Sequence, residues 1–227
     1  MGDHGKLYPT YTTAMQDKMR QLIPYATIMT PNLTELCALL EVPYPHDIIN
    51  RDELIEMCRQ LSNLGPQMVV VTGINIGDEI INFAYEQGKE PAIIKVKRIG
   101  DDRSGTGDVI SGVIAGSYLN VLNFYQCVEK AVNFASRCIE YSLAVGAHNH
   151  LGLCFEPFIK SSWRVNGSPK PQNTTSLNAV KSYFSNSAII ISTVGSLFNH
   201  REFDSSISFV FRKQKVHAQL HLFVLLT

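Results

Sequence analysis

The pattern of apolar and polar positions divides most of the chain into alternating helices and strands. Apolar side chains recur at helical spacing in residues 34–40, 51–64, 109–119 and 125–145. Residues 68–72 (MVVVT) form a continuous apolar run, which is typical of a strand buried on both faces. Further strands are predicted at residues 26–30, 79–85, 92–98 and 153–155. Strands and helices in this order predict an α/β fold with a layered sheet.

The pattern changes near residue 160. Beyond it Ser and Asn are frequent, and the apolar runs at 189–191 and 220–226 belong to no clear supersecondary unit. We therefore divide the chain into a sheet-containing domain, residues 1–160, and a tail of unknown structure, residues 161–227. The tail is open to three interpretations: disorder, a small β appendage, or the product of a faulty gene prediction. The sequons at Asn166 and Asn173 are interpreted as chance matches.

Composition narrows the class of protein. The 227 residues carry a formal net charge of +0, so no basic excess points to nucleic acid or to an anionic membrane surface. The apolar runs are too short to span a bilayer, and the polar start lacks the apolar segment of a signal peptide. The five cysteines are scattered, which favours free thiols in a reducing compartment. We expect a cytoplasmic protein without nucleic-acid or membrane partners.

The stretch most informative about chemistry is the glycine-rich segment at residues 103–112 (RSGTGDVISG). Gly105 and Gly107 flank Thr106, and glycines allow a backbone to approach an anion closely. Asp108 is expected to begin the apolar helix that follows. The first N–H groups of a helix have no internal partners and lie at the positive end of its dipole. The segment therefore predicts a phosphate-binding loop.

The aspartate at the end of this loop suggests a reaction. The Asp108 carboxylate could take the proton of a substrate hydroxyl as that oxygen attacks the γ-phosphorus of ATP. The alternative is a plain turn with an aspartate cap, which these residues alone do not exclude. The segment is not a Walker A loop, because no Lys-Ser/Thr pair follows the glycines.

Other segments precede the glycine loop in a characteristic order: residues 1–8 (MGDHGKLY), 28–40 (IMTPNLTELCALL) and 69–72 (VVVT). Together with GTGD at residues 105–108 they resemble the pyridoxal kinases of the ribokinase-like superfamily, over roughly residues 1–158. The form of the first segment favours pyridoxal kinases over the related hydroxymethylpyrimidine kinases. The resemblance implies an α/β/α layered sheet in residues 1–160. It also implies ATP-dependent phosphorylation of the 5′-hydroxymethyl group of pyridoxal or a related form of vitamin B6.

The resemblance implies roles for individual positions as well. Asp108 matches the catalytic base, which contacts the substrate, and the anion hole is matched by Gly105, Thr106 and Gly107. Positions that organise the nucleotide, its phosphates and the cations are matched by Thr30, Asn32, Glu35 and Thr72. Thr30 and Thr72 both end predicted strands, and ligands are expected at the carboxyl ends of strands in such sheets.

The resemblance further assigns a metal site and a substrate contact near the start of the chain. Asp3 and Glu35 match positions near the metal, and Mg²⁺ prefers oxygen ligands while keeping several waters. Tyr8 matches an aromatic residue near the pyridoxal site. Each has a simpler alternative: Glu35 could be only the capping-box partner of Asn32, Asp3 a solvated residue, and Tyr8 part of the surface.

The family pattern carries further residues before the Gly-Asp motif in which this sequence starts. We therefore expect a truncated ribokinase-like sheet with one strand left as a raw edge, and an incomplete pocket for the pyridine ring. The resemblance implies ATP, Mg²⁺ and a monovalent cation as cofactors, a B6 vitamer and ATP as small-molecule partners, and a homodimer. Two alternatives remain open: a catalytically inactive nucleotide-binding fragment, and a hydroxymethylpyrimidine kinase.

Overall fold

The structure is a computed structural model that describes residues 1–9, 11–47, 49–119, 122–158 and 223–224. The helices are α1 (Thr13–Leu22), α2 (Leu33–Leu40), α3 (Arg51–Asn63), α4 (Thr106–Leu119) and α5 (Phe124–Ala144), with 3-10 turns at Ile23–Tyr25 and Asn149–Leu151. The strands are β1 (Gly2–Asp3), β2 (Lys6–Leu7), β3 (Ile28–Met29), β4 (Met68–Ile76), β5 (Glu79–Glu86), β6 (Ala92–Lys97) and β7 (Phe223–Val224). This content of helices and strands confirms the predicted α/β class.

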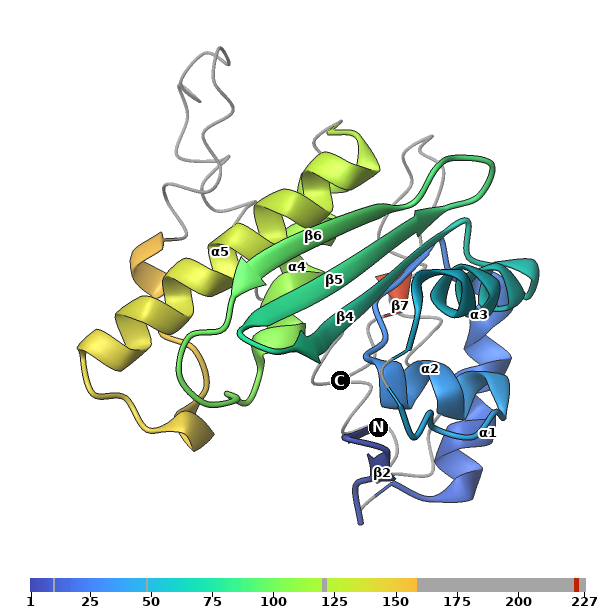
Figure 1. Ribbon diagram of the computed structural model, residues 1–227, viewed down its shortest axis with the longest axis horizontal. Coiled ribbons are helices and arrows are strands. Elements are labelled where there is room, and N and C mark those ends of the chain that lie inside the picture. The colour runs from blue at the N-terminus through green and yellow to red at the C-terminus, as the bar shows by residue number, and fades with distance from the viewer. Residues whose placement is uncertain (10, 48, 120–121, 159–222, 225–227) are drawn as a thin grey trace, which may run out of the picture. The chain divides into compact units, whose positions relative to one another are not determined.

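Five strands of the described chain form the central sheet, in the order β6-β5-β4-β3-β7 (Figure 1). β3 runs parallel to β4, with Ile28 opposite Met68 and Met29 opposite Val69. β7 lies parallel to β3 on its other side, whereas β5 and β6 extend the sheet in antiparallel fashion. Because β3 and β4 are parallel, the segments that follow them leave the sheet at the same edge.

Helices cover both faces of this sheet. α4 and α5 pack on one face, where Met68 and Val70 belong to the same core as Val128 of α5. Successive side chains of a strand point to opposite faces, so Val69 and Val71 point to the other side, where α2 and α3 contact β4. Residues 69–71 are completely buried. The two-sided burial expected for this strand is confirmed, and the helices complete an α/β/α layering (Figure 1).

Asparagine side chains define where three of the helices begin. Asn32 precedes α2, Asn50 precedes α3 and Asn123 precedes α5, and each accepts a hydrogen bond from the backbone N–H three residues later. Asn32 and Asn50 each form a full capping box, with Glu35 and Glu53 respectively. The capping box expected at Asn32 is therefore confirmed.

Several elements differ from the sequence-based prediction. α4 begins at Thr106, so Asp108 lies inside its first turn rather than opening it. β4 continues past Thr72 to Ile76, through an irregularity in its pairing with β5 between Val71 and Ile74. No strand forms at residues 153–155; Leu153 is instead buried in the core beneath α4 and α5.

The sequence pattern also gives no signal for α1 or for the hairpin β1–β2. Met19 is the buried residue of α1, so the helix shows little apolar periodicity. Each strand of the hairpin is two residues long, too short for an alternating pattern. These elements form through contacts with the rest of the chain rather than through a local pattern.

The expected tail, residues 161–227, lies outside the described residues except for Phe223 and Val224, which form β7. The described residues all belong to one unit of the chain, residues 1–165 with 222–227, and the other unit, residues 166–221, is among those not described. The sequons at Asn166 and Asn173 fall there too. Since β7 pairs with β3, β3 is not an edge strand of the sheet.

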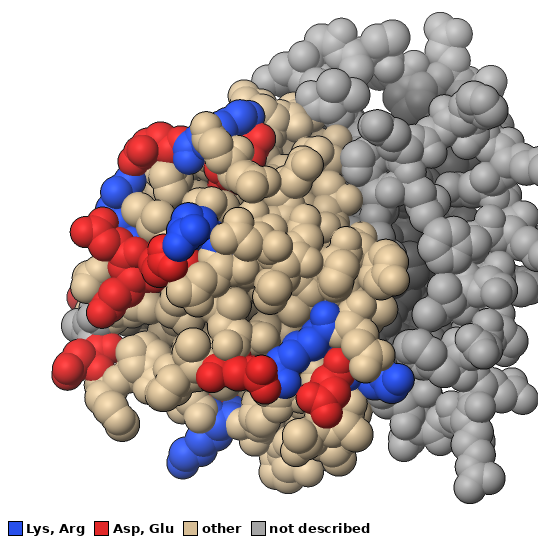
Figure 2. Space-filling view, turned by 90° about the vertical axis from the view of Figure 1, so that its right-hand side faces the viewer, with Lys and Arg blue, Asp and Glu red and all other residues tan. Residues whose placement is uncertain are grey.

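The surface carries charges of both signs. On the face shown in Figure 2, blue and red side chains are interspersed around a largely uncharged middle. This distribution agrees with the formal net charge of +0. Within the described part of the chain, no helix combines the length and the apolar character that a membrane crossing requires.

Candidate functional site

The segment after β3 lies against the middle of β4. Thr72 N donates to Pro31 O at 2.9 Å, and Asn32 and Thr72 form an isolated parallel bridge. Thr30 and Thr72 are both buried. The parallel pairing of β3 and β4 thus brings Thr30, Asn32 and Thr72, all predicted to bind nucleotide or phosphate, together at the carboxyl end of β3. Thr72 itself lies within β4 rather than at its end.

Asn32 and Glu35 form a polar network at this edge. Asn32 Oδ1 accepts from Glu35 N, and Glu35 Oε2 accepts from Asn32 N, each at 2.9 Å. The α-ammonium group of Met1 donates to Glu35 Oε1 at 3.0 Å, and Asn32 Nδ2 donates to Gly2 O at 2.8 Å. Burial raises the pKa of Glu35, while the Met1 ammonium and the Asn32 N–H group oppose that rise. Both carboxylate oxygens of Glu35 are therefore engaged within the chain.

The hairpin β1–β2 places Asp3 beside this network. The turn of the hairpin consists of His4 and Gly5, whose φ angles are 48° and 76°. Gly5 N donates to Thr34 Oγ1 at 2.8 Å, which fixes the turn against the start of α2. Asp3, just before the turn, is exposed, and its Oδ1 accepts from His4 N at 2.8 Å. The Asp3 carboxylate is thus held at the surface near the start of α2.

Two tyrosines follow the hairpin. Tyr8 is 50% exposed, and its pKa is raised by partial burial and by the negative charges of Asp3 and Glu35. Burial, together with the charge of Glu35, raises the pKa of Tyr11 to about 12. Both phenols therefore lie within electrostatic range of the Glu35 carboxylate.

The glycine loop joins the sheet to α4. Gly105 has a φ of 77°, a value that favours glycine, and its carbonyl accepts the first helical hydrogen bond, from Val109 N at 3.1 Å. The N–H groups of Thr106 and Gly107 consequently have no acceptor within the helix. A Cβ atom at Gly105 would lie 3.8 Å from Asp108 Oδ2, so the carboxylate folds back toward the loop. Loop and carboxylate are therefore neighbours, as the sequence predicts.

Side-chain contacts connect this loop and helix to the rest of the edge. The hydroxyl oxygens of Thr30 and Ser111 are 2.7 Å apart and buried, which joins the end of β3 to α4. His4 Nε2 lies 3.3 Å from Asp102 Oδ2, which joins the hairpin to the segment before the loop. The structure thus gathers the hairpin, the segment after β3, Thr72 and the glycine loop around one edge of the sheet.

The donor set at this edge fits Mg²⁺ in part. Asp3 offers exposed carboxylate oxygens, and Mg²⁺ typically takes one or two carboxylates while phosphates and waters complete its shell. Glu35 is buried, and each of its oxygens accepts one hydrogen bond from within the chain. No cluster of three or more His, Cys, Asp or Glu side chains suited to a metal is found among the residues that the structure describes. Asp3 is the better candidate for a metal contact that the nucleotide completes.

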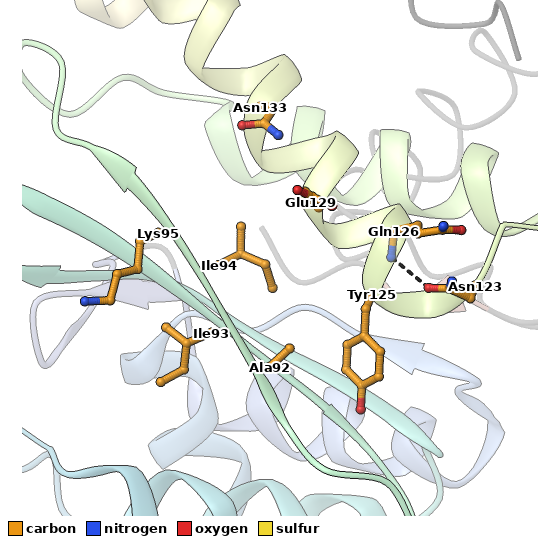
Figure 3. A pocket seen from close by; sticks show the side chains of 9 residues that line it. All are labelled: Ala92, Ile93, Ile94, Lys95, Asn123, Tyr125, Gln126, Glu129 and Asn133. Atoms are coloured by element: carbon orange, nitrogen blue, oxygen red, sulfur yellow. Dashed lines mark hydrogen bonds between the residues drawn. The ribbon is translucent and has the colours of Figure 1, made fainter. Parts of the chain in front are cut away.

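A separate pocket of about 500 Å³ lies between β6 and α5 (Figure 3). Ile93 and Lys95 of β6 and Tyr125 and Glu129 of α5 are among its lining residues. None of the predicted site residues lines it. No glycine is among its lining residues. At the start of α5, which the pocket includes, Asn123 Oδ1 already accepts from Gln126 N. The pocket does not belong to the candidate site.

Comparison with known proteins assigns the family. The sequence profile of the family described as phosphomethylpyrimidine kinase matches residues 8–152, which is more than half of the chain. The chain belongs to the phosphomethylpyrimidine kinase family. This range contains α2, β3, β4 and the glycine loop, and so most of the candidate site.

Several members of this family resemble the chain. Pyridoxine kinase of Bacillus subtilis is 36% identical over 159 residues, which are 67% of this chain and 56% of the relative. Hydroxymethylpyrimidine/phosphomethylpyrimidine kinase of Mycobacterium bovis is 26% identical over 143 residues, 61% of this chain and 50% of the relative. A phosphomethylpyrimidine-kinase-type protein of Bacteroides thetaiotaomicron, solved with pyridoxal, superposes with a TM-score of 0.67 at 30% identity, over 76% of this chain and 60% of that one.

These similarities confirm the ribokinase-like fold and the membership in the pyridoxal kinase and hydroxymethylpyrimidine kinase group. They also show that the chain spans about half the length of the curated relatives that it matches.

Sequence reasoning missed two residues of this site. Ser111 contacts Thr30, and its position three residues after Asp108 places it on the same side of α4, which is a usable signal. Arg103 is buried at the first position of the glycine-rich segment, although its charge suggests an exposed residue. The burial of Arg103 cannot be predicted from a single charged residue in a loop pattern.

Proposed function

We propose that this chain forms the nucleotide-binding part of an ATP-dependent kinase that phosphorylates the 5′-hydroxymethyl group of pyridoxal or a related vitamin B6 form. One observation carries the proposal. The glycine loop with Asp108 shares an edge of the sheet with Thr72 and the capped segment at Asn32, and the contact between Thr30 and Ser111 joins the two parts.

The proposed step is an in-line transfer. The substrate hydroxyl oxygen forms a bond to the γ-phosphorus of ATP, the bond to the bridging oxygen of ADP breaks, and the hydroxyl proton passes to the Asp108 carboxylate. The N–H groups of the loop and of the first turn of α4 stabilise the negative charge on the transferring phosphoryl. General-base assistance of this kind is worth roughly 10²–10⁴ in rate.

The remaining residues position the reactants. Thr30, Asn32 and Thr72 would contact the triphosphate, and Glu35 holds Asn32 through the capping box. Asp3 would hold Mg²⁺, which neutralises phosphate charge when it is bound. Tyr8, exposed beside Asp3, would contact the pyridine ring.

Two kinds of relative support two candidate substrates. The pyridoxine kinase of Bacillus subtilis and the pyridoxal-bound structure of the Bacteroides thetaiotaomicron protein favour a B6 vitamer. The Mycobacterium bovis relative favours hydroxymethylpyrimidine as the second candidate. Both substrates present a hydroxymethyl group on an aromatic ring, so the same loop and carboxylate would serve either.

A coupled assay of ADP release with the purified chain tests this proposal. We expect ADP release that depends on ATP, Mg²⁺ and pyridoxal, with hydroxymethylpyrimidine as the weaker substrate in direct competition. Faster turnover of hydroxymethylpyrimidine would replace the first substrate by the second. Binding of ATP without turnover of either would instead identify the chain as an inactive nucleotide-binding fragment.

A further inference from the structure

Arg103 is held at the junction between the glycine loop and the segment that follows α5. Its carbonyl accepts from Thr106 Oγ1 at 2.9 Å, so its backbone belongs to the loop. Its Nη2 donates to Ala147 O at 2.9 Å. The same two segments meet through Ser104 N and Asn149 O, 3.4 Å apart. The backbone of Arg103 is thus fixed to the start of α4, and its guanidinium group to the segment after α5.

The rest of this guanidinium group has no partner. Arg103 is 7% exposed, and its Nε and Nη1 atoms are buried without an acceptor among the residues that the structure describes. The acidic neighbour Asp102 is directed elsewhere, to His4 and Arg98. A buried cation with unmet N–H groups is unfavourable unless an anion meets it. An anionic ligand bound at this position would remove that cost.

The glycine loop indicates which anion this is. A guanidinium group presents its N–H groups in a planar fork that matches the oxygens of a phosphate. The N–H groups at the start of α4 favour the same ligand. Gly105 and Gly107 are exposed, and a Cβ atom at Gly107 would meet nothing within 4 Å, so the loop leaves room there.

We propose that the guanidinium group of Arg103 binds a phosphate group of the nucleotide while Nη2 remains anchored to Ala147. The proposal rests on the nucleotide site proposed above. Arginine suits this double task because different nitrogens serve the anchor and the ligand. The ammonium group of a lysine is a single point of charge and cannot span both.

Isothermal titration of the purified chain with MgADP, adenosine and inorganic pyrophosphate tests the role. Arg103→Gln should weaken MgADP binding by about 10- to 100-fold, the loss of a charged hydrogen-bonded contact, and leave adenosine binding unchanged. It should abolish the heat of pyrophosphate binding. Arg103→Lys should give an intermediate loss of MgADP affinity. Arg59→Gln, which removes an exposed arginine on α3, is the matched control and should bind as the wild type does.

The outcomes separate this inference from the proposed function. If the wild-type chain binds MgADP and the affinity of Arg103→Gln is within twofold of it, the role of Arg103 alone is overturned. If the wild-type chain binds no MgADP, the proposed nucleotide site and this inference are overturned together. If Arg103→Gln does not fold, Arg103→Lys decides, and MgADP affinity equal to that of the wild type overturns the role.

Discussion

At the scale of single residues, Asn32 connects several parts of the candidate site. Its side chain caps α2 by accepting from Glu35 N and reaches the hairpin by donating to Gly2 O. Its backbone bridges to Thr72 on β4. One side chain therefore combines a helix cap with a contact between segments far apart in the sequence.

Replacing Asn32 removes both the helix cap and the contact with the hairpin. Asn32→Ala should lower the free energy of unfolding by about 1–2 kcal/mol, the usual worth of an N-cap, and should also weaken MgADP binding because the hairpin and the segment before α2 lose their link. Urea denaturation and titration with MgADP measure the two effects.

Asn50 provides the control, because it forms the same capping box at the start of α3 with Glu53. Asn50→Ala should cost similar stability and leave MgADP affinity unchanged. If both variants lose MgADP affinity equally, the site does not include Asn32.

At the scale of elements, the hydroxyl pair of Thr30 and Ser111 ties β3 to α4. Both residues are buried, at 4% and 2% exposure, and their oxygens are 2.7 Å apart. The contact sets the distance between the segment after β3 and the turn that carries Asp108. The geometry of the proposed transfer depends on this spacing.

Removing one hydroxyl leaves the other buried without its partner. Ser111→Ala and Thr30→Val should each lower the free energy of unfolding by about 1–3 kcal/mol, and the double variant by less than the sum. Urea denaturation of the four proteins gives the coupling. Additive losses would mean that the two hydroxyl groups do not interact.

The helices and strands illustrate what a sequence can and cannot predict. The apolar run at residues 68–72 and the Asn32–Glu35 capping box are local signals, and both are confirmed. The contact between Thr30 and Ser111 spans 81 positions, so it depends on how β3 and α4 pack and leaves no local trace. For the same reason the sequence does not predict α1 and wrongly predicts a strand at residues 153–155. Tertiary contacts decide the conformation of both segments.

The candidate site follows the same division. The order of the motifs predicts that the glycine loop, Asp108, Asn32 and Thr72 share one site. In the structure, the loop and Asp108 lie side by side. The engagement of both Glu35 oxygens and the burial of Arg103 depend on three-dimensional surroundings. Residue type and spacing carry no information on either.

At the scale of the whole molecule, buried thiols link stability to alkaline pH. Burial raises the pKa of Cys58 from 9.0 to about 12. It also raises the pKa of Cys127 and of Cys138 to about 11 each. Above pH 9 the unfolded chain releases these protons while the folded chain retains them, so stability falls as pH rises from about 9 and levels off near 12.

The pH dependence of urea denaturation measures this effect. At pH 10 the Cys58 thiol alone should cost about 1.4 kcal/mol relative to pH 8, given an unfolded pKa of 9.0. The variant Cys58→Ala should show a shallower decline over the same range. Constant stability between pH 8 and pH 10 would show that the thiols ionise equally in the folded and unfolded chain.

The chain as a whole has a ribokinase-like sheet whose proposed nucleotide site lies at one edge, and it spans about half the length of its curated relatives. Whether that edge performs phosphoryl transfer depends on Asp108, which the loop at Gly105 holds beside the first turn of α4. The two roles, holding phosphate and accepting a proton, belong to different groups and are separable by mutation.

The most direct measurement compares wild-type chain with Asp108→Asn for transfer of phosphate from ATP to pyridoxal, together with the affinity of each for MgADP. We predict that turnover falls by about 10²–10⁴ while MgADP affinity stays close to that of the wild type, because asparagine keeps the shape of the side chain but cannot take the proton. Equal turnover of the two proteins would contradict the role of Asp108 and with it the proposed reaction.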